Sequence, residues 1–559
     1  MIRNPYLWSV FRLILSLKSS KLRIFSLKPL IFKLKYIGFQ ERNRDITIIT
    51  HAFRTFKPCK KTLGTKIDSC ILFLGFEYFS AIYFSDLSIF AIFAPVIQTV
   101  TIMTEYIHRN IDSELIAWKE DSMRKPLLLR GTRQVGKSSA VKNFGKQFEY
   151  FAEVNFERNK AIKTFFQGDI NVRLIAKKIS SYINVPVEAG KTLLFLDEIQ
   201  ECPEAIMALR FFKEDYPELH VIAAGSLLEF ALQELPTFGV GRIHSLFMYP
   251  MTFDEFLYAN HEEGLILLRN EAYGNQSLDQ AFHDKLVEYF RTYLLVGGMP
   301  ESVLAWTKTH DFNRCRNIQE DIILTYEDDF SKYKKRVKPD LLRTTMRGIC
   351  HQAGEKLTYK QISADYQSSQ IREALRLLTL AGIVTPVVAT SGNGIPLDAE
   401  ADEKSMKVLF LDPGLLLAVL QLEGDLSQQL IELILAGTPQ ELVNKGGVTE
   451  MVAGLEMMRY KPCIQRQKMF YWEQKGKSVA EIDYLEIHNM KITPIEIKSG
   501  TQGGMKSLWL FMREKKLTEA FRCSLENFGS FDYIDKQDDD AIRHVTILPL
   551  YALSLLRSH

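Results

Sequence analysis

The chain has 559 residues, of which 46% are hydrophobic and 25% are charged, and its formal net charge is +3. This composition is that of a soluble globular protein, and the length exceeds what one hydrophobic core serves, so several domains are expected. The seven cysteines include no CxxC pair, which argues against a disulfide framework or a zinc knuckle and indicates a reducing cytoplasm.

Residues 1–102 differ in composition from the rest of the chain. They contain 15 Lys/Arg and 5 Asp/Glu, whereas the remainder contains 55 and 62. The apolar stretch 72–101 is interrupted by Glu77 and Asp86, and its charge-free part is only just long enough to span a bilayer. Amphipathic sequence begins abruptly at Met103. We therefore expect translation to start there and 1–102 to be a mis-assigned extension; a membrane anchor and a poorly structured arm are the alternatives.

A phosphate-binding loop is predicted within residues 126–148, which show a short apolar strand, a glycine-containing loop and a helix. Two glycines let backbone N–H groups turn toward phosphate oxygens, Lys137 reaches the β- and γ-phosphates, and the Ser138 hydroxyl holds Mg²⁺. The helix presents its positive N-terminal end to the same anion. The predicted site for ATP and Mg²⁺ comprises Gly131, Thr132, Arg133, Gln134, Val135, Gly136, Lys137, Ser138 and Ser139.

Two carboxylates follow the apolar run TLLFL, which predicts a strand buried on both faces of a parallel sheet. Asp197 and Glu198 thus lie at the carboxyl edge of the sheet, where ligands of such folds bind. We expect Asp197 to contact Mg²⁺ through water and Glu198 to orient the water that attacks the γ-phosphate.

Two further catalytic candidates follow along the chain. Ser226 ends the next apolar strand, where it is placed to sense the γ-phosphate; a plain strand end is the alternative. Arg242 follows a glycine-bearing loop and is a candidate for the finger that neutralises transition-state charge, in cis or from a neighbouring subunit. An ordinary surface arginine is the alternative for this residue.

The segments GTRQVGKS, LLFLDEIQ and GRI…MYPMTFDEF together resemble a large prokaryotic family of AAA-type ATPases, from about Met103 to the C-terminus. Members of this family join the ATPase module to a C-terminal domain of unknown function, DUF4143. The resemblance implies ATP binding and slow hydrolysis, an α/β P-loop NTPase domain with a parallel sheet over residues 103–255, and a helical lid or linker over 256–345.

Residues 346–415 predict a winged-helix-like domain. Two amphipathic helices are followed by a strand, a polar turn and a second strand, which is a DNA-reading arrangement. However, Arg372 and Arg376 are the only basic residues of the second helix and the turn is acidic, whereas a DNA-docking surface is clustered positive. A spacer or a surface that forms a homo-oligomer is therefore the alternative.

Residues 416–559 carry a second group of candidate catalytic residues. Asp483 lies in one strand-like segment, and Glu496 and Lys498 share one face of the next because strand side chains alternate. Two carboxylates at this spacing are suited to bind a Mg²⁺ ion that also contacts phosphate oxygens. The lysine would stabilise charge or help to deprotonate the attacking water. Glu450, from the preceding helix, is a further candidate metal ligand.

This E…D…ExK pattern resembles the PD-(D/E)XK nuclease superfamily, which implies a restriction-endonuclease-like α/β domain with Glu450, Asp483, Glu496 and Lys498 at its active site and DNA as partner. An exposed hairpin, and the same fold without cleavage, are the alternatives. Two functions follow: an ATPase that controls nucleic-acid binding or cleavage, and a non-cutting switch whose C-terminal domain binds a protein. The acidic balance of residues 103–559 favours the second, and the intact carboxylate–lysine set favours the first.

Overall fold

The computed structural model describes residues 106–226, 228–234, 241–274, 277–333, 336–421, 445–464, 468–474, 480–499 and 504–557. All of them belong to one unit, Thr104–His559. The expectations for residues 1–102 lie outside the described residues. In the part of the chain that is described, no helix combines the length and the apolar character needed to cross a bilayer.

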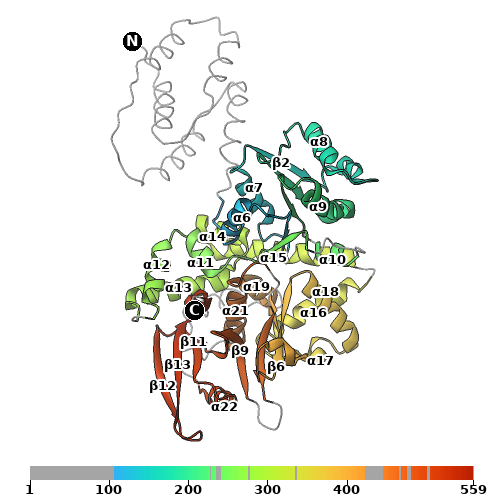
Figure 1. The fold of residues 1–559 in the computed structure, drawn as a ribbon. Coiled ribbons are helices and arrows are strands. Elements are labelled where there is room, and N and C mark those ends of the chain that lie inside the picture. Colours follow the sequence, from blue (N-terminus) through green and yellow to red (C-terminus); the bar gives the residue numbers. More distant parts are fainter. Residues whose placement is uncertain are drawn as a thin grey trace, which may run out of the picture. The chain divides into compact units, whose positions relative to one another are not determined.

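The first sheet is five-stranded and wholly parallel, in the order β2-β3-β4-β1-β5. This confirms the expected α/β fold with a P-loop type of parallel sheet. Its strands are β1 (Leu127–Arg130), β2 (Tyr150–Asn155), β3 (Thr192–Asp197), β4 (His220–Ala224) and β5 (His244–Phe247). Its helices are α6 (Ile111–Glu120), α7 (Lys137–Gly145), α8 (Val172–Ile183), α9 (Pro203–Asp215) and α10 (Leu228–Glu234), with short 3-10 turns η1 (Lys160–Phe166) and η2 (Ile199–Glu201). Figure 1 labels strand β2 of this sheet, close to helices α7, α8 and α9.

Both faces of this sheet are buried. Leu127 and Leu129 of β1 pack into the core that includes α6 and α7, whereas Leu128 packs into the core that includes α8 and α9. Phe195 and Leu194 of β3 alternate between the same two cores. A strand covered on both sides has no polar face, which explains why these strands are continuous apolar runs in the sequence.

A helical region follows the first sheet. It comprises α11 (Phe253–Ala259), α12 (Glu263–Ala272), α13 (Gln280–Val296), α14 (Pro300–Thr309), α15 (Phe312–Asp329), η3 (Phe330–Tyr333), α16 (Pro339–His351), α17 (Tyr359–Ile362), α18 (Ser368–Leu380) and α19 (Pro413–Gln421). The break between α13 and α14 requires glycine: Gly297 has a φ of 72°, and a Cβ on Gly298 would lie 2.2 Å from the carbonyl oxygen of Met251.

The second sheet is mixed and has eight strands in the order β12-β13-β11-β10-β9-β8-β6-β7. The strands are β6 (Val384–Thr390), β7 (Ala401–Phe410), β8 (Met469–Glu473), β9 (Glu481–His488), β10 (Lys491–Ile497), β11 (Glu519–Ser524), β12 (Gly529–Asp535) and β13 (Ala541–Pro549), with η4 (Leu397–Glu400), α21 (Lys445–Arg459), α22 (Lys506–Glu514) and η5 (Leu550–Arg557). Strands β6 and β7 follow α17 and α18, as a wing follows its helices. They do not form a separate sheet, however, because β6 pairs in parallel with β8 from Val387↔Met469 to Ala389↔Tyr471.

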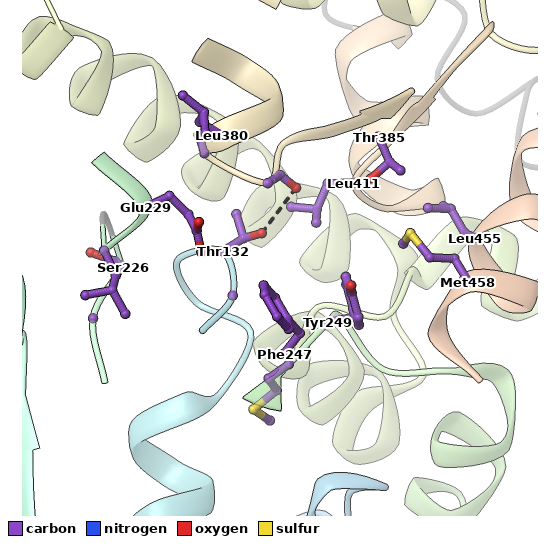
Figure 2. A pocket seen from close by; sticks show the side chains of 16 residues that line it. Thr132, Ser226, Glu229, Phe247, Tyr249, Leu380, Thr385, Leu411, Leu455 and Met458 are labelled. Atoms are coloured by element: carbon purple, nitrogen blue, oxygen red, sulfur yellow. Dashed lines mark hydrogen bonds between the residues drawn. The ribbon is translucent and has the colours of Figure 1, made fainter. Parts of the chain in front are cut away.

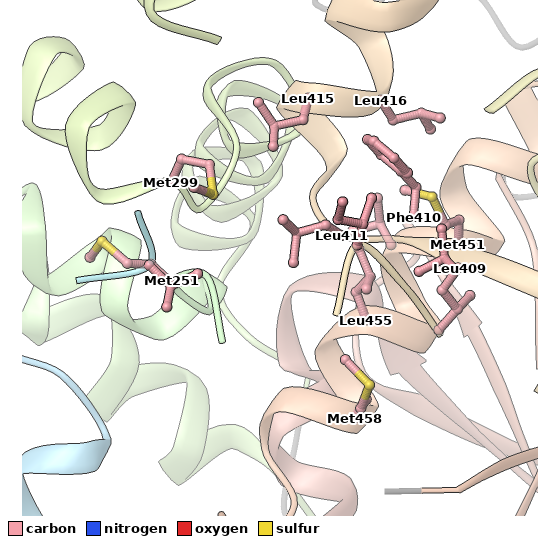
Figure 3. Close-up of a cluster of buried hydrophobic side chains, with 14 of the residues drawn as sticks. Met251, Met299, Leu409, Phe410, Leu411, Leu415, Leu416, Met451, Leu455 and Met458 are labelled. Carbon is pink, nitrogen blue, oxygen red and sulfur yellow. The ribbon is translucent and has the colours of Figure 1, made fainter. Parts of the chain in front are cut away.

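One apolar core joins the helical region to the second sheet. Figure 3 shows Met251 and Met299 near Leu411 and Leu415, with Met458 and Leu455 of α21 beside them. A buried polar group lies in the same region: Arg459 donates to the carbonyl oxygens of Leu411 (2.8 Å) and Met251 (3.1 Å) and forms an ion pair with Glu456 (3.3 Å). Since unpaired buried charges are strongly destabilising, this pairing fixes α21 against both segments.

Candidate nucleotide site and C-terminal carboxylate cluster

The loop between β1 and α7 has a conformation that requires its glycines. Gly131 has a φ of 142°, and a Cβ there would lie 2.1 Å from the carbonyl oxygen of Met248. Gly136 has a φ of 96°, and Gln134 between them is also left-handed at 65°. These positive φ values curl the backbone tightly, so the predicted phosphate-binding loop has the shape that exposes successive N–H groups to an anion.

Lys137 lies inside this loop. Its Nζ donates to the carbonyl oxygens of Gly131 (2.8 Å) and Thr132 (2.7 Å). Burial lowers the pKa of Lys137 to about 8, while the nearby carboxylates of Glu198 and Asp197 act in the opposite direction. The ammonium therefore stays charged at neutral pH and is placed to bind phosphate.

The expected Mg²⁺ ligands Ser138 and Asp197 lie together. The Ser138 hydroxyl donates to the two carboxylate oxygens of Asp197, at 3.1 and 3.3 Å. Asn155 Nδ2 donates to the same carboxylate at 3.1 Å; this residue ends β2, opposite Asp197 in the sheet, and was not predicted. Burial, with help from Glu198, raises the pKa of Asp197. A hydroxyl and a buried carboxylate supply the oxygen ligands that Mg²⁺ prefers, so these residues fit the ion.

Glu198 and Ser226 are also brought together. Strand β4 lies between β1 and β3, so its carboxyl end emerges between the phosphate-binding loop and the two carboxylates. Glu198 Oε2 accepts from the hydroxyl of Ser226 at 3.3 Å and from Nε2 of Gln200 at 2.7 Å. Glu198 has a left-handed φ of 51°. A non-glycine residue in this region is held there by its surroundings, as is common at functional sites.

Arg109, which was not predicted from the sequence, packs against the phosphate-binding loop. Its side chain is buried, and it donates to the carbonyl oxygens of Val135 (2.9 Å) and Tyr249 (2.7 Å) while pairing with Glu255 (3.0 Å). The residue lies before the first strand and far from the loop in sequence, so no local spacing predicts this contact.

Two later segments of the chain also contact the phosphate-binding loop. Arg133 forms an ion pair with Asp329 of α15 (2.9 Å), and the Tyr326 hydroxyl donates to the Arg133 carbonyl oxygen (2.8 Å). The Thr132 hydroxyl donates to the carbonyl oxygen of Gly382, just before β6 (3.3 Å; Figure 2). Gln134 and Ser139 are exposed. The loop is therefore in direct contact with both the helical region and the start of the second sheet.

A pocket lies next to these contacts. Figure 2 shows Phe247 and Tyr249 on one side and Leu455 and Met458 of α21 on another. Leu380 of α18 also lines it. The space beside the phosphate-binding loop is thus bounded by three regions of the chain.

Arg242 lies away from the loop of its own chain. Its guanidinium pairs with Glu214 near the end of α9, and its side chain is 54% exposed. It precedes β5, which begins opposite Leu127 at the start of β1, whereas the phosphate-binding loop follows the end of β1. The structure therefore does not bring Arg242 to the other site residues, and a catalytic role for it requires a neighbouring copy of the chain.

Replacement of Arg242 by alanine is predicted to slow ATP turnover by at least about tenfold without loss of nucleotide binding, as expected for a charge that acts only in the transition state. Because the arginine would act between subunits, mixing Arg242→Ala with Glu198→Gln should restore part of the activity. Phosphate release measures both effects. Unchanged turnover in Arg242→Ala would show that the residue forms only its surface pair with Glu214.

The C-terminal candidates also lie together. Glu450 of α21 and Asp483 of β9 join Glu481, which was not predicted, in a group whose carboxylate oxygens lie within 4.8 Å of one another. Asp483 accepts a hydrogen bond from the backbone N–H of Ile497 at 2.7 Å, which places β10 beside it. The expected proximity of helix and strands is therefore present.

Glu496 and Lys498 form the second half of the group. Lys498 Nζ lies 2.5 Å from Glu496 Oε1, whereas Glu496 Oε2 is buried and has no hydrogen-bond partner. Burial raises the pKa of Glu496 to about 7, and the carboxylate of Asp483 adds to this effect. Burial likewise raises the pKa of Asp483 and, together with Asp483, that of Glu450. These carboxylates hold their charges at a high electrostatic cost.

Lys407 of β7 is another residue of this group that was not predicted from the sequence. Its side chain is 2% exposed, and its Nζ lies 2.6 Å from Glu450 and 3.9 Å from Asp483, with Glu481 in contact. Burial acts to lower the pKa of Lys407, but the three carboxylates outweigh burial and raise it. The register Val387↔Lys407 places this lysine beside β6. It reaches the three carboxylates only because β6 pairs with β8, a pairing that was not predicted from the sequence.

Glu496 makes stability depend on pH in a defined direction. Its pKa is about 7 in the folded chain and near 4.5 when unfolded, so between these values the unfolded chain binds fewer protons. The free energy of unfolding contributed by Glu496 therefore falls as pH rises from about 4.5 to 7. Glu496→Gln should flatten this slope in metal-free denaturation curves. The exposed Glu519→Gln is the control, and an equal slope in wild type and Glu496→Gln would contradict the burial argument.

Three family profiles match successive parts of the chain. Residues 123–257 match a profile described as an AAA domain, residues 287–426 a domain of unknown function (DUF8612), and residues 445–552 a domain of unknown function (DUF4143). The first and third confirm the resemblance found in the sequence. The DUF8612 match covers part of the expected lid region (256–345), the whole of the expected winged-helix region (346–415) and the first residues beyond it.

Individual proteins match only part of the chain, and at low sequence identity. Uncharacterized protein MJ1637 of Methanocaldococcus jannaschii is 27% identical over 192 residues, which are 32% of this chain and 39% of that protein. The chain thus spans about two fifths of this curated relative. Among solved structures, the Walker-type ATPase PABY2304 of Pyrococcus abyssi is 14% identical with a TM-score of 0.36, covering 57% of this chain and 97% of that one. The Aeropyrum pernix ORC1 protein in complex with DNA is 13% identical with a TM-score of 0.25, covering 59% and 97%.

Proposed function

We propose that this chain, which belongs to a prokaryotic family of AAA-type ATPases, hydrolyses ATP in order to control how its C-terminal domain engages nucleic acid. In this proposal residues 103–255 form the ATPase domain, 256–345 the lid, 346–415 the winged-helix-like region and 416–559 the nuclease-like domain. Mg²⁺ bound with ATP supplies charge neutralisation at the phosphates. The chain's own residues bind, orient and sense the nucleotide.

The residues near the loop have distinct roles in the proposed reaction. The loop amides and Lys137 bind the phosphates, and Ser138 with Asp197 holds the ion. Glu198 orients the attacking water, and Ser226, hydrogen-bonded to Glu198, reports whether a γ-phosphate is present. Gln200 also donates to Oε2 of this carboxylate and so helps to fix its orientation.

The observation that carries the control function is a continuous path from the loop to the C-terminal cluster, which comprises Glu450, Glu481, Asp483 and Glu496. Thr132 contacts Gly382, which precedes β6; Val387 of β6 pairs with Lys407 of β7; and Lys407 contacts Glu450 of the cluster. Comparison of DNA binding with and without ATP tests whether this path couples the two sites.

The proposal is tested by DNA binding and cleavage. Full-length chain and its Asp483→Ala variant are incubated with linear, supercoiled and branched DNA and with Mg²⁺ or Mn²⁺, with and without ATP. Fluorescence anisotropy should show a DNA affinity that depends on ATP in wild type and not in Lys137→Ala. Equal affinities with and without ATP would refute control by nucleotide. Cleavage by wild type and not by Asp483→Ala would establish a nuclease.

One observation favours a second candidate, a non-cutting ATP-dependent switch whose C-terminal domain binds a protein partner. Arg376 of α18 is paired with Glu373 (2.7 Å), which neutralises one of the two basic residues expected to face DNA. Residues 103–559 are also acidic in balance, whereas nonspecific DNA affinity comes chiefly from basic surface. ATP hydrolysis without any DNA binding would support this candidate.

A further inference from the structure

The C-terminal cluster, defined as Glu450, Glu481, Asp483 and Glu496, surrounds an ammonium group. Lys407 Nζ contacts the first two carboxylates and lies 3.9 Å from Asp483 Oδ1. The lysine comes from β7, whereas Asp483 and Glu481 come from β9 and Glu450 comes from α21. Carboxylates from two elements, β9 and α21, therefore converge on a cation from a third, β7.

This ammonium occupies the place that a divalent metal would need. The oxygens of Glu450, Glu481 and Asp483 that lie within 4.8 Å of one another are the donor set for an ion, and Lys407 already contacts two of these carboxylates. A metal ion and an ammonium this close would repel each other. If the carboxylates bound the metal instead, the buried ammonium of Lys407 would lose its partners, which is strongly destabilising. As arranged, the cluster does not fit a metal.

A second observation is that one carboxylate oxygen of the cluster has no hydrogen-bond donor and is free to accept from a ligand. Glu496 is 5% exposed, and its Oε2 has no hydrogen-bond partner although Lys498 satisfies Oε1. A buried carboxylate oxygen without a donor is unfavourable. The cluster thus keeps one acceptor for a positive or hydrogen-bonding group, while Lys407 contacts Glu450 and Glu481.

We propose that Lys407 is the resident cation of the C-terminal cluster and excludes divalent metal from it, so that metal binds there only when Lys407 is displaced. This inference rests on the proposed function for the identity of the domain, and it specifies how the domain is held inactive. It predicts that wild-type chain without nucleotide has no metal site at Asp483.

The test is a Mn²⁺ titration of the full-length chain without nucleotide, followed by electron paramagnetic resonance. Wild type and Asp483→Ala should bind equal numbers of Mn²⁺ ions, since any site near Asp197 is common to both. Lys407→Met should gain one site per chain, and Lys407→Met combined with Asp483→Ala should lose it. The control is Lys461→Met, which removes a lysine paired with Glu486 of the same strand β9 (2.7 Å) and should gain no site.

Removal of Lys407 leaves several carboxylates without their cation, so Lys407→Met is also combined with Glu481→Gln to reduce their repulsion. Mn²⁺ should raise the melting temperature of either variant by more than it raises that of wild type, because any site near Asp197 is common to all of them. One more Mn²⁺ site in wild type than in Asp483→Ala overturns the proposal, as does a folded Lys407→Met with no added site. If neither Lys407 variant folds, the wild-type comparison alone decides. ATP turnover on the same preparations separates failure of the ATPase proposal from failure of this one.

Discussion

ATP turnover is expected to disappear when Lys137 is replaced by alanine. The ammonium lies inside the phosphate-binding loop, 2.8 Å from the carbonyl oxygen of Gly131, and the loop closes around it. Loss of one donor that stabilises developing charge lowers rates by about 10²–10³-fold, and here the phosphates also lose their main cationic contact. Steady-state phosphate release measures the effect.

A matched control for this variant is Lys142→Ala on the same helix. Lys142 pairs with Glu153 at 2.9 Å and is half exposed, so its loss should leave turnover close to wild type. Circular dichroism should show that both variants are folded. Hydrolysis that persists in Lys137→Ala would mean that the loop does not hold the reacting phosphate.

Glu198→Gln is expected to separate binding from hydrolysis. The amide retains the size of the side chain and can still accept from Ser226, but it cannot take a proton from the attacking water. Loss of a general base lowers rates by about 10²–10⁴-fold. Nucleotide binding should remain, because Lys137 and Ser138 are unchanged. Binding of a fluorescent ATP analogue and single-turnover hydrolysis measure the two steps separately.

The control for this variant is Glu201→Gln, which alters a carboxylate in the same segment. Glu201 lies 3.4 Å from Lys163 in an exposed pair, away from the loop. Its replacement should change neither binding nor turnover. A Glu198→Gln variant that hydrolyses ATP at the wild-type rate would remove Glu198 from the reaction and direct attention to another carboxylate.

The grouping of the candidate nucleotide-site residues was largely predictable because short stretches of sequence carry most of them. Gly131, Gly136 and Lys137 share one turn, whose left-handed φ values explain why glycines recur at that spacing. Asp197 and Glu198 end an apolar strand, and parallel strands bring their carboxyl ends to a common edge. Local sequence and sheet geometry therefore placed these residues correctly relative to one another.

Residues whose roles depend on distant pairing were not predictable. Arg109 reaches the loop from outside the sheet, and Lys407 reaches the C-terminal cluster only because β6 pairs with β8. The helix–turn–helix and its wing were expected to stand apart from the C-terminal domain, whereas the wing strands are continuous with its sheet. Periodicity identifies a strand but not its partner, so such non-local contacts need the folded structure.

The central claim is that nucleotide at the loop alters the C-terminal cluster through β6 and β7. Hydrogen exchange with mass spectrometry on full-length Glu198→Gln, with and without Mg²⁺ and ATP, tests it most directly. We predict changed protection in residues 401–412 and 481–498 as well as in 126–145, and none of these changes in Lys137→Ala. Protection confined to 126–145 and 192–200 would contradict it, because the nucleotide would then bind without reaching the cluster.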